Sequence, residues 1–191
     1  MDDPGSQILS FHRLISQLST QALDDVWRRC AKVFDIQSQG VLDCTEEALS
    51  EALGGLEALP LNVPIFGLLD ASSHEFFHLT MRANLPDDVI PSAPVPELGS
   101  CEAWLLHQII LDPVVGAAAD EPKELSFLHD LGEVSARLIA GECQMLFLVR
   151  SMDLELFEAV VQQGQLLPPK ATYFDPKLPT GLVMQGLDGE L

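Results

Sequence analysis

The run of residues from Cys143 to Val149 most constrains the fold, because Gln144 is its only polar member. An apolar stretch of this length without alternation is typical of a central β-strand that is buried on both faces. It is far too short to cross a bilayer as a helix. The sequence therefore predicts a sheet whose middle contains this segment.

Helical and extended patterns alternate on either side of this strand. Apolar residues from position 20 to 34 recur at three- and four-residue spacing, which predicts a helix with one buried face, capped by Ser19 or Thr20. Further helices are expected from Thr45, from Ser100 to a stop at Pro113, over about 132–140, and after Ser151 or Asp153, and strands over 7–15, 64–69 and 75–81. These patterns indicate an α+β fold, with a mixed, largely antiparallel sheet and helices packed mainly on one face.

The chain has room for one domain with a proper core, and we expect residues 1–191 to form a single unit. The stretch 86–99 contains four prolines, which predicts a loop or an internal linker.

The charge balance excludes several kinds of partner. Ten Lys and Arg residues face 29 Asp and Glu residues, for a formal net charge of −19. Nucleic acids and anionic membranes require basic side chains, so neither is an expected partner. Residues 1–15 lack the basic start and apolar stretch of a signal peptide, and we expect a cytoplasmic protein. Its four cysteines are too widely spaced for a zinc motif, and we expect buried free thiols.

One local motif matches HExxH, from His74 to His78. On a helix, the two histidines would bind zinc, Glu75 would be the general base, and Glu102 would be a third ligand. The alternation of residues 77–82 instead favours a strand, which would hold the two histidines roughly 13 Å apart. We therefore expect no metal site, and a zinc peptidase is the less favoured alternative.

The tail gathers two of the ten basic residues and the only tyrosine among prolines that stiffen the backbone. Lysine ammonium groups and hydroxyl groups are typical ligands of a phosphate or carboxylate. The expected anion site consists of Lys170, Thr172, Tyr173, Lys177 and Thr180. The alternative is a packed terminal strand with solvated lysines.

His12 and Arg13, adjacent in the first expected strand, are a second candidate for anion binding. Arginine offers a bidentate fork, and histidine adds another donor. The alternative for this pair is structural hydrogen bonding. His107, amid apolar helix residues, is expected to be a satisfied core histidine.

Four blocks of the sequence occur in an order that matches a known family. They are Asp2-Asp3-Pro4-Gly5 with Ile8-Leu9 and His12-Arg13, Leu106-His107 with Leu111-Asp112-Pro113-Val114-Val115-Gly116, Gly141 to Leu148, and Pro168 to Val183. They resemble the elements DDPGLvILPTHR, LH…LEPLLG, GxxQaaFLL and PPKSTYFYPKLPTGLV of an uncharacterised prokaryotic family, domain of unknown function 1015. The chain departs from these patterns at Ser10-Phe11, Ala171 and Asp175.

The resemblance implies that this chain corresponds to the C-terminal part of a protein about twice as long, either as a fragment in which Met1 is an internal methionine or as the product of a split gene. The family's Gly-His-His-Arg-Tyr motif precedes the first block and is missing here. The N-terminal half of the family is similar to the ParB/sulfiredoxin-like superfamily, some of whose members hydrolyse nucleotides or transfer phosphate.

By that analogy, the family acts on small phosphorylated molecules or nucleotides, as a kinase or phosphotransferase. The chain alone, in which no cofactor is evident, is not expected to be catalytic. The alternative is a non-enzymatic interaction or oligomerisation module. Its expected partner is the missing N-terminal half of the family or a second copy of the chain.

Overall fold

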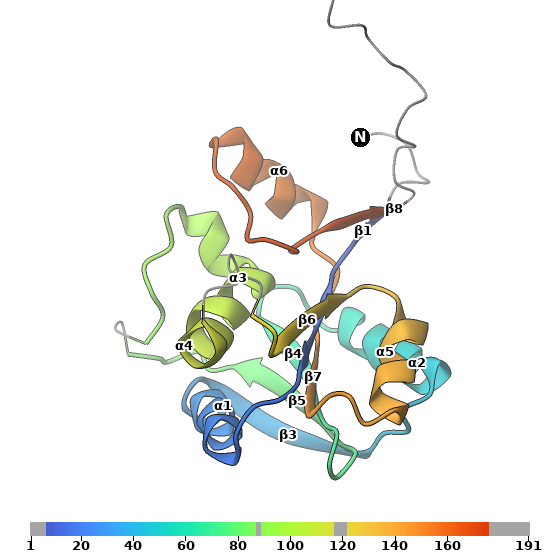
Figure 1. The fold of residues 1–191 in the computed structure, drawn as a ribbon. Helices are drawn as coiled ribbons and strands as arrows, with labels where there is room; N and C mark the ends of the chain where they lie inside the picture. Colours follow the sequence, from blue (N-terminus) through green and yellow to red (C-terminus); the bar gives the residue numbers. More distant parts are fainter. Residues whose placement is uncertain (1–6, 87–88, 117–121, 176–191) are drawn as a thin grey trace, which may run out of the picture.

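The computed structural model describes residues 7–86, 89–116 and 122–175, which form an antiparallel sheet with helices on both faces (Figure 1). The main sheet has six strands in the order β3-β5-β4-β7-β2-β6, and β1 pairs separately with β8. The strands are β1 (Gln7–Leu9), β2 (His12–Ile15), β3 (Phe34–Val41), β4 (Ile65–Asp70), β5 (Glu75–Met81), β6 (Leu125–Leu128), β7 (Met145–Leu148) and β8 (Tyr173–Asp175). The helices are α1 (Thr20–Val33), α2 (Glu46–Glu57), η1 (Pro96–Ser100), α3 (Glu102–Leu106), η2 (His107–Leu111), α4 (Asp112–Val115), α5 (Leu131–Ile139) and α6 (Leu154–Gln162).

The expected central strand is confirmed as β7. It lies between β4 and β2, and all four of its residues are buried. Its partners are antiparallel on both sides, with Gly67 opposite Leu148 and Arg13 opposite Phe147. The α+β class is also confirmed, and every strand pair in the described ranges is antiparallel.

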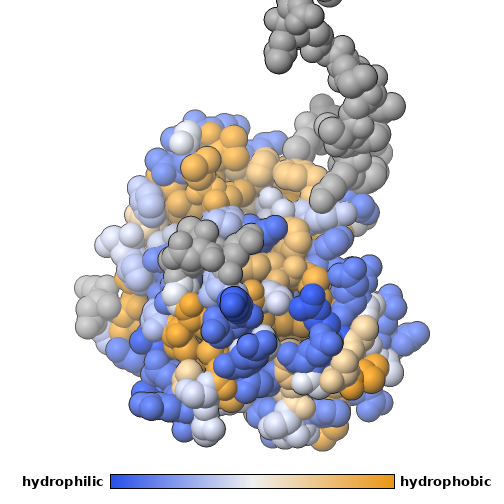
Figure 2. Space-filling view, in the orientation of Figure 1, coloured by the Kyte–Doolittle hydropathy of each residue, from blue (hydrophilic) through white to orange (hydrophobic). Residues whose placement is uncertain are grey.

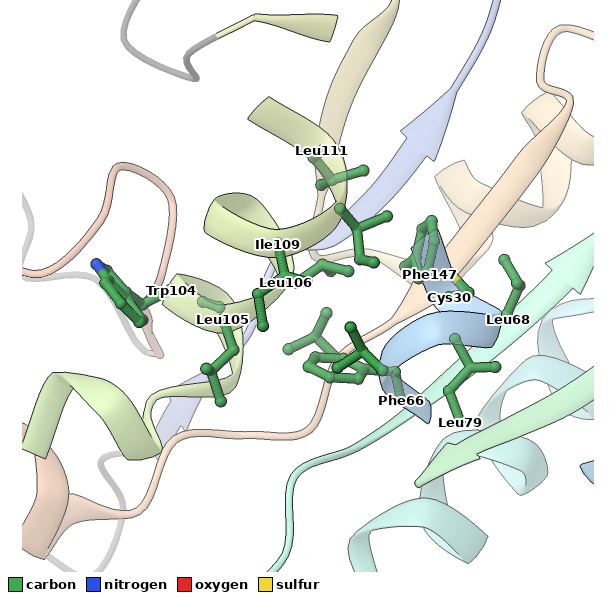
Figure 3. Packing of buried hydrophobic residues seen from close by; sticks show 14 of the residues in the cluster. Cys30, Phe66, Leu68, Leu79, Trp104, Leu105, Leu106, Ile109, Leu111 and Phe147 are labelled. Carbon is green, nitrogen blue, oxygen red and sulfur yellow. The ribbon is translucent and has the colours of Figure 1, made fainter. Parts of the chain in front are cut away.

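Alternate residues of the central strands enter two separate hydrophobic clusters. Phe66 and Leu68 belong to the larger cluster with α1, α3 and η2, as Figure 3 shows for Cys30, Leu105 and neighbouring residues. The intervening residues of the same strands join a smaller cluster with α2 and α5. Because successive side chains of a strand point to opposite faces, helices cover both faces of the sheet, with the larger group on one of them.

Several helix starts lie where the sequence predicts them. Ser19 caps α1 and Thr45 caps α2, each accepting a bond from the backbone N–H three residues later. The helix that begins at residue 102 does not stop at Pro113, as expected, but continues to Val115. Proline has no N–H to donate to a carbonyl of the preceding turn, and Arg29 Nη1 donates to the Ile109 carbonyl in that turn at 3.3 Å. A contact from α1 thus satisfies the helix where local sequence alone would break it.

Two parts of the chain differ from their sequence patterns. The expected strand over 7–15 is divided at Ser10 and Phe11 into β1 and β2, which belong to different sheets. The segment 89–99 packs Leu98 and several partly buried apolar residues against the larger cluster. None of the helices in the described ranges is both long and apolar enough to span a membrane.

Candidate functional site

The side chain of Arg13 lies at the centre of a buried polar network beside β6. Arg13 is fully buried, and its guanidinium donates to three acceptors. Nε donates to His107 Nε2 at 3.4 Å, Nη2 to the Lys170 carbonyl at 3.1 Å, and Nη1 to the Phe11 carbonyl. The guanidinium carbon also lies 5.4 Å from the centroid of the Phe127 ring. Burial lowers the pKa of Arg13 to about 10, so the group remains charged at neutral pH.

Lys170 projects from this network toward a group of aromatic rings. Its Nζ lies 5.7 Å from the centroid of the Phe11 ring, which also contacts Tyr173 edge to face at 5.8 Å. His129 stacks on Tyr173 with ring centroids 3.7 Å apart. The backbone of Lys170 has φ +57°, an uncommon conformation for a side-chain-bearing residue, and Arg13 holds its carbonyl in place. Fixed backbone and aromatic contact together restrict where the ammonium group can lie.

Two further cations, Lys123 and Arg137, lie near β6, around Ser126. A hollow of about 310 Å³ is lined by Lys123, Ser126, Phe127 and Lys170 among others. A neighbouring hollow of about 550 Å³ shares Lys123 and Ser126 and adds Arg137. Arg137 Nη1 donates to Ser126 Oγ at 3.2 Å. We call Lys123, Ser126, Arg137 and Lys170 the β6 cation surface.

The cations of the β6 cation surface differ from four other basic residues in having no ion pair among the described contacts. Nine of the ten basic residues lie in the described ranges, all except Lys177. Four of them are paired with carboxylates, namely Arg28, Arg29, Arg82 and Arg150. The described contacts show no ion pair for Lys123, Arg137 or Lys170, although the chain carries a net charge of −19. Three cations with no ion pair among the described contacts, around one short strand, favour anion binding there.

The structure brings together four of the residues expected to bind an anion. Arg13, Lys170 and Tyr173 are linked through Phe11, and His12 precedes Arg13 in β2. Only Lys170 among these presents a charged group at the surface, because Arg13 and His12 are buried. Burial, followed by the charge of Arg13, lowers the pKa of His12 to about 4, and its Nδ1 accepts from the Val149 N–H at 3.3 Å. Neither residue offers a donor to solvent in this conformation.

The other expected ligands divide into two groups. Thr172 is partly buried and lies between Lys170 and β8. Lys177 and Thr180 lie outside the described residues. His107, expected to be a satisfied core histidine, is buried and bonded on both ring nitrogens, to Arg13 and Asp112.

The zinc alternative does not fit the structure. Residues 75–81 form strand β5, as their alternation predicts, and His74 lies in the preceding turn with φ +58°. Glu102, the expected third ligand, instead accepts bonds from Arg150 and from the Ile65 N–H. Within the described residues, no group of three or more His, Cys, Asp or Glu side chains is placed to hold a metal ion. In an extended strand, the side chains of His74 and His78 would lie too far apart to share one metal ion, whereas on a helix they would lie one turn apart on the same face.

Sequence reasoning missed Lys123 and Arg137. Neither lies in a motif, and β6 itself was not predicted, because a four-residue strand has little periodicity. The available signal was the scarcity of cations in an acidic chain. Locating those cations required the fold, since residues 123, 137 and 170 are brought together only by the placement of β6 beside β2.

No family model matches the chain, and no curated protein is significantly similar to it. Among solved structures, a free serine kinase in complex with AMP is similar over 91% of this chain and 56% of its own, with 14% identity and a TM-score of 0.48. A mutant of a free serine kinase with AMP covers 91% and 56%, with 12% identity and a TM-score of 0.49. A conserved hypothetical protein from Pyrococcus furiosus covers 91% and 57%, with 14% identity and a TM-score of 0.44. This chain therefore spans little more than half the length of these structures, and likenesses this distant do not identify its function.

Proposed function

We propose that this chain binds a small phosphorylated molecule, with a nucleotide as the first candidate, at the β6 cation surface. The observation that supports the proposal is the gathering of Lys123, Arg137 and Lys170, none of them in an ion pair within the described contacts, around two adjoining hollows. A phosphate group accepts several charge-assisted hydrogen bonds, which lysine and arginine supply. Ser126 adds a hydroxyl between the cations.

The aromatic residues beside Lys170 favour a ligand with a flat ring. Phe11, His129 and Tyr173 form a continuous set of ring contacts next to the ammonium group. Aromatic side chains bind nucleobases by stacking or edge contact. A phosphate near Lys170 and a base against this set would engage both parts of a nucleotide.

The chain is proposed to be the C-terminal portion of a member of the domain of unknown function 1015 family. On that proposal, the part of the family protein that precedes the chain carries the phosphotransfer chemistry, and the β6 cation surface contributes binding. The four cysteines of the chain are all buried free thiols, which agrees with a reducing, cytoplasmic location.

Isothermal titration calorimetry of the full 191-residue chain with inorganic phosphate and with AMP tests the proposal. We expect weak binding, with AMP tighter than phosphate, and a loss of about fivefold in affinity for each of Lys123→Ala, Arg137→Ala and Lys170→Ala. Lys32→Ala is the matched control, because Lys32 is in no described ion pair but lies in the last turn of α1, away from both hollows. Equal losses in the control and the three variants, or no binding of either ligand, would disprove the assignment.

A second candidate function is partner binding through α6, which has one fully buried residue, Val160. Val161 and Leu166 expose 48% and 88% of their surfaces, and Figure 2 shows a hydrophobic area over this helix. Such an area is typical of a surface that another chain covers. The proposed occupant is the N-terminal half of the family protein or a second copy of the chain.

Sedimentation velocity of the chain, alone and with Val161→Asp and Leu166→Asp together, distinguishes these two occupants. A concentration-dependent dimer that the two substitutions abolish supports self-association. A monomer at all concentrations refutes self-association and leaves the N-terminal half as the occupant to test.

A further inference from the structure

A third hollow, of about 200 Å³, lies among the start of α3, the start of α6 and the corner between β1 and β2. It shares no lining residue with the two hollows of the β6 cation surface. Its apolar wall includes Val149, Met152 and Leu156, and its polar wall includes Arg150, Glu102 and Asp153. A volume below that of drug-sized sites restricts it to a small molecule.

The arginine in this wall has no donor left for a ligand. Arg150 is 3% exposed, and a guanidinium carries five N–H groups. Nε and one Nη2 bond go to Glu102, the other Nη2 bond goes to the Val63 carbonyl at 3.0 Å, and Nη1 donates to the carbonyls of Leu59 and Pro60, each at 3.1 Å. Five described bonds occupy five donors, so Arg150 holds the wall together and cannot receive an anion.

The side-chain polar atoms that remain on the wall are mainly acceptors. All described bonds to Glu102 use Oε1, which leaves Oε2 without a described donor. Asp153 stands at the N-cap of α6 but makes no capping bond, and its carboxylate has no partner among the described contacts. Ser10 and Ser151 also line the hollow. Ser10 donates its hydroxyl proton to the Arg150 carbonyl at 2.6 Å, and Ser151 donates to Glu57 at 2.6 Å, so each oxygen keeps only its acceptor lone pairs for a ligand.

Because acceptors outnumber free donors among the side chains of the wall, we propose that the hollow binds a small primary ammonium compound with a short apolar frame. The ammonium group supplies three donors and a positive charge to the acceptors of Glu102, Asp153 and Ser10. The apolar frame lies against Val149, Met152 and Leu156. The side chains of the wall disfavour an anion, because it would meet two carboxylates and an arginine whose donors are all in use. This site is independent of the β6 cation surface.

Three probes with the same carbon frame test the proposal on the full chain: n-butylammonium, butan-1-ol and butyrate. The methyl group of Met152 reports occupancy in carbon-proton NMR spectra of methyl-labelled protein, assigned through Met152→Leu. Met81 and Met145, which do not line the hollow, are internal references. We expect saturable shifts of the Met152 signal with n-butylammonium, weaker ones with butan-1-ol and none with butyrate.

Two variants separate this site from general attraction to an acidic protein. Asp153→Asn is expected to weaken n-butylammonium binding by about fivefold. Glu155→Gln removes the same charge from the same helical turn but does not line the hollow, and it is expected to leave binding unchanged. The proposal fails if butyrate shifts the Met152 signal as much as n-butylammonium does, if n-butylammonium leaves that signal unmoved, or if the two variants weaken binding equally.

Discussion

Arg13 and His107 are 94 positions apart in the chain, and Arg13 Nε donates to His107 Nε2 at 3.4 Å. Because arginine only donates, Nε2 must be the acceptor, and the ring proton of His107 is on Nδ1. Nδ1 then donates to Asp112 Oδ1 at 2.9 Å. Burial, followed by the charge of Arg13, lowers the pKa of His107, which agrees with a neutral ring. The histidine thus connects a buried cation to a carboxylate near the surface.

Removal of that carboxylate is expected to destabilise the protein. Asp112→Ala should lower the free energy of unfolding by about 2 kcal/mol, because the buried His107 loses its charged acceptor. Asp112→Asn, which keeps an acceptor oxygen, should cost about half as much. Urea denaturation measures both values. Asp24→Asn, an exposed carboxylate with no described bond, is the control, and an equal effect there would refute the role of Asp112.

Acid should destabilise the protein through His12. Its pKa is lowered to about 4 by burial and by the charge of Arg13, whereas the unfolded chain has the ordinary value of 6.5. Between these values the unfolded state binds more protons, so stability rises with pH across the window and is lost as pH falls from about 6.5 to about 4. Each pH unit in the window contributes up to about 1.4 kcal/mol.

Denaturation at a series of pH values measures this slope. In His12→Asn the amide oxygen replaces Nδ1 as the acceptor for the Val149 N–H, and the slope should flatten. His74→Asn changes an exposed histidine and should leave the slope as it is. An unchanged slope in His12→Asn would assign the acid sensitivity to other groups.

Two glycine substitutions should change the free energy of unfolding in opposite directions. A Cβ at Gly67, in β4, would lie 2.7 Å from the Phe76 ring and 2.8 Å from Leu56 Cδ1, so Gly67→Ala should destabilise the protein by about 2 kcal/mol. A Cβ at Gly54, inside α2, meets nothing within 4 Å, and Gly54→Ala should stabilise the protein by about 0.5–1 kcal/mol. Thermal or urea unfolding of the two variants checks both signs.

The four cysteines should be inert to thiol reagents in the folded state. Burial raises the pKa of Cys30 to about 12 and that of Cys143 to about 11, and it also raises the pKa of Cys44 and Cys101. Because the thiolate is the reactive species, a disulfide reagent at pH 8 should modify none of them rapidly. In denaturant the same reagent should modify all four. A fast-reacting thiol in the native protein would contradict the packing described for it.

Local sequence patterns were sufficient to predict the helices with one buried face and the strand that is buried on both faces. The helix over 20–33, its cap at Ser19 and the helix after Thr45 follow from spacing and capping chemistry, and the strand over 145–148 follows from its uninterrupted apolar run. The prediction that the HExxH segment is a strand follows from the alternation of its apolar and polar residues. Each of these signals lies within a few neighbouring residues, which is why a single sequence contains it.

The candidate site could be predicted only in part. Lys170 and Tyr173 stood out because the tail is unusual in composition, whereas Lys123 and Arg137 had no local signal. For Arg13 the sequence left anion binding and structural hydrogen bonding open, and in the structure its donors are taken by carbonyls and by His107. Which donors remain for a ligand depends on contacts between residues distant in the chain.

Residue type and order by themselves determined the acidic charge, the free cysteines, the central strand and most helix starts, because each depends on composition or on neighbours within one or two turns. Only the tertiary structure decided that the chain divides at Ser10 between two sheets, that Arg29 sustains the helix through Pro113, and that Lys123, Arg137 and Lys170 gather at β6. The physical reason is the same in all three cases. A hydrogen-bond partner or a neighbouring charge that lies many residues away has no fixed spacing in the sequence, and the folded chain alone brings it into contact.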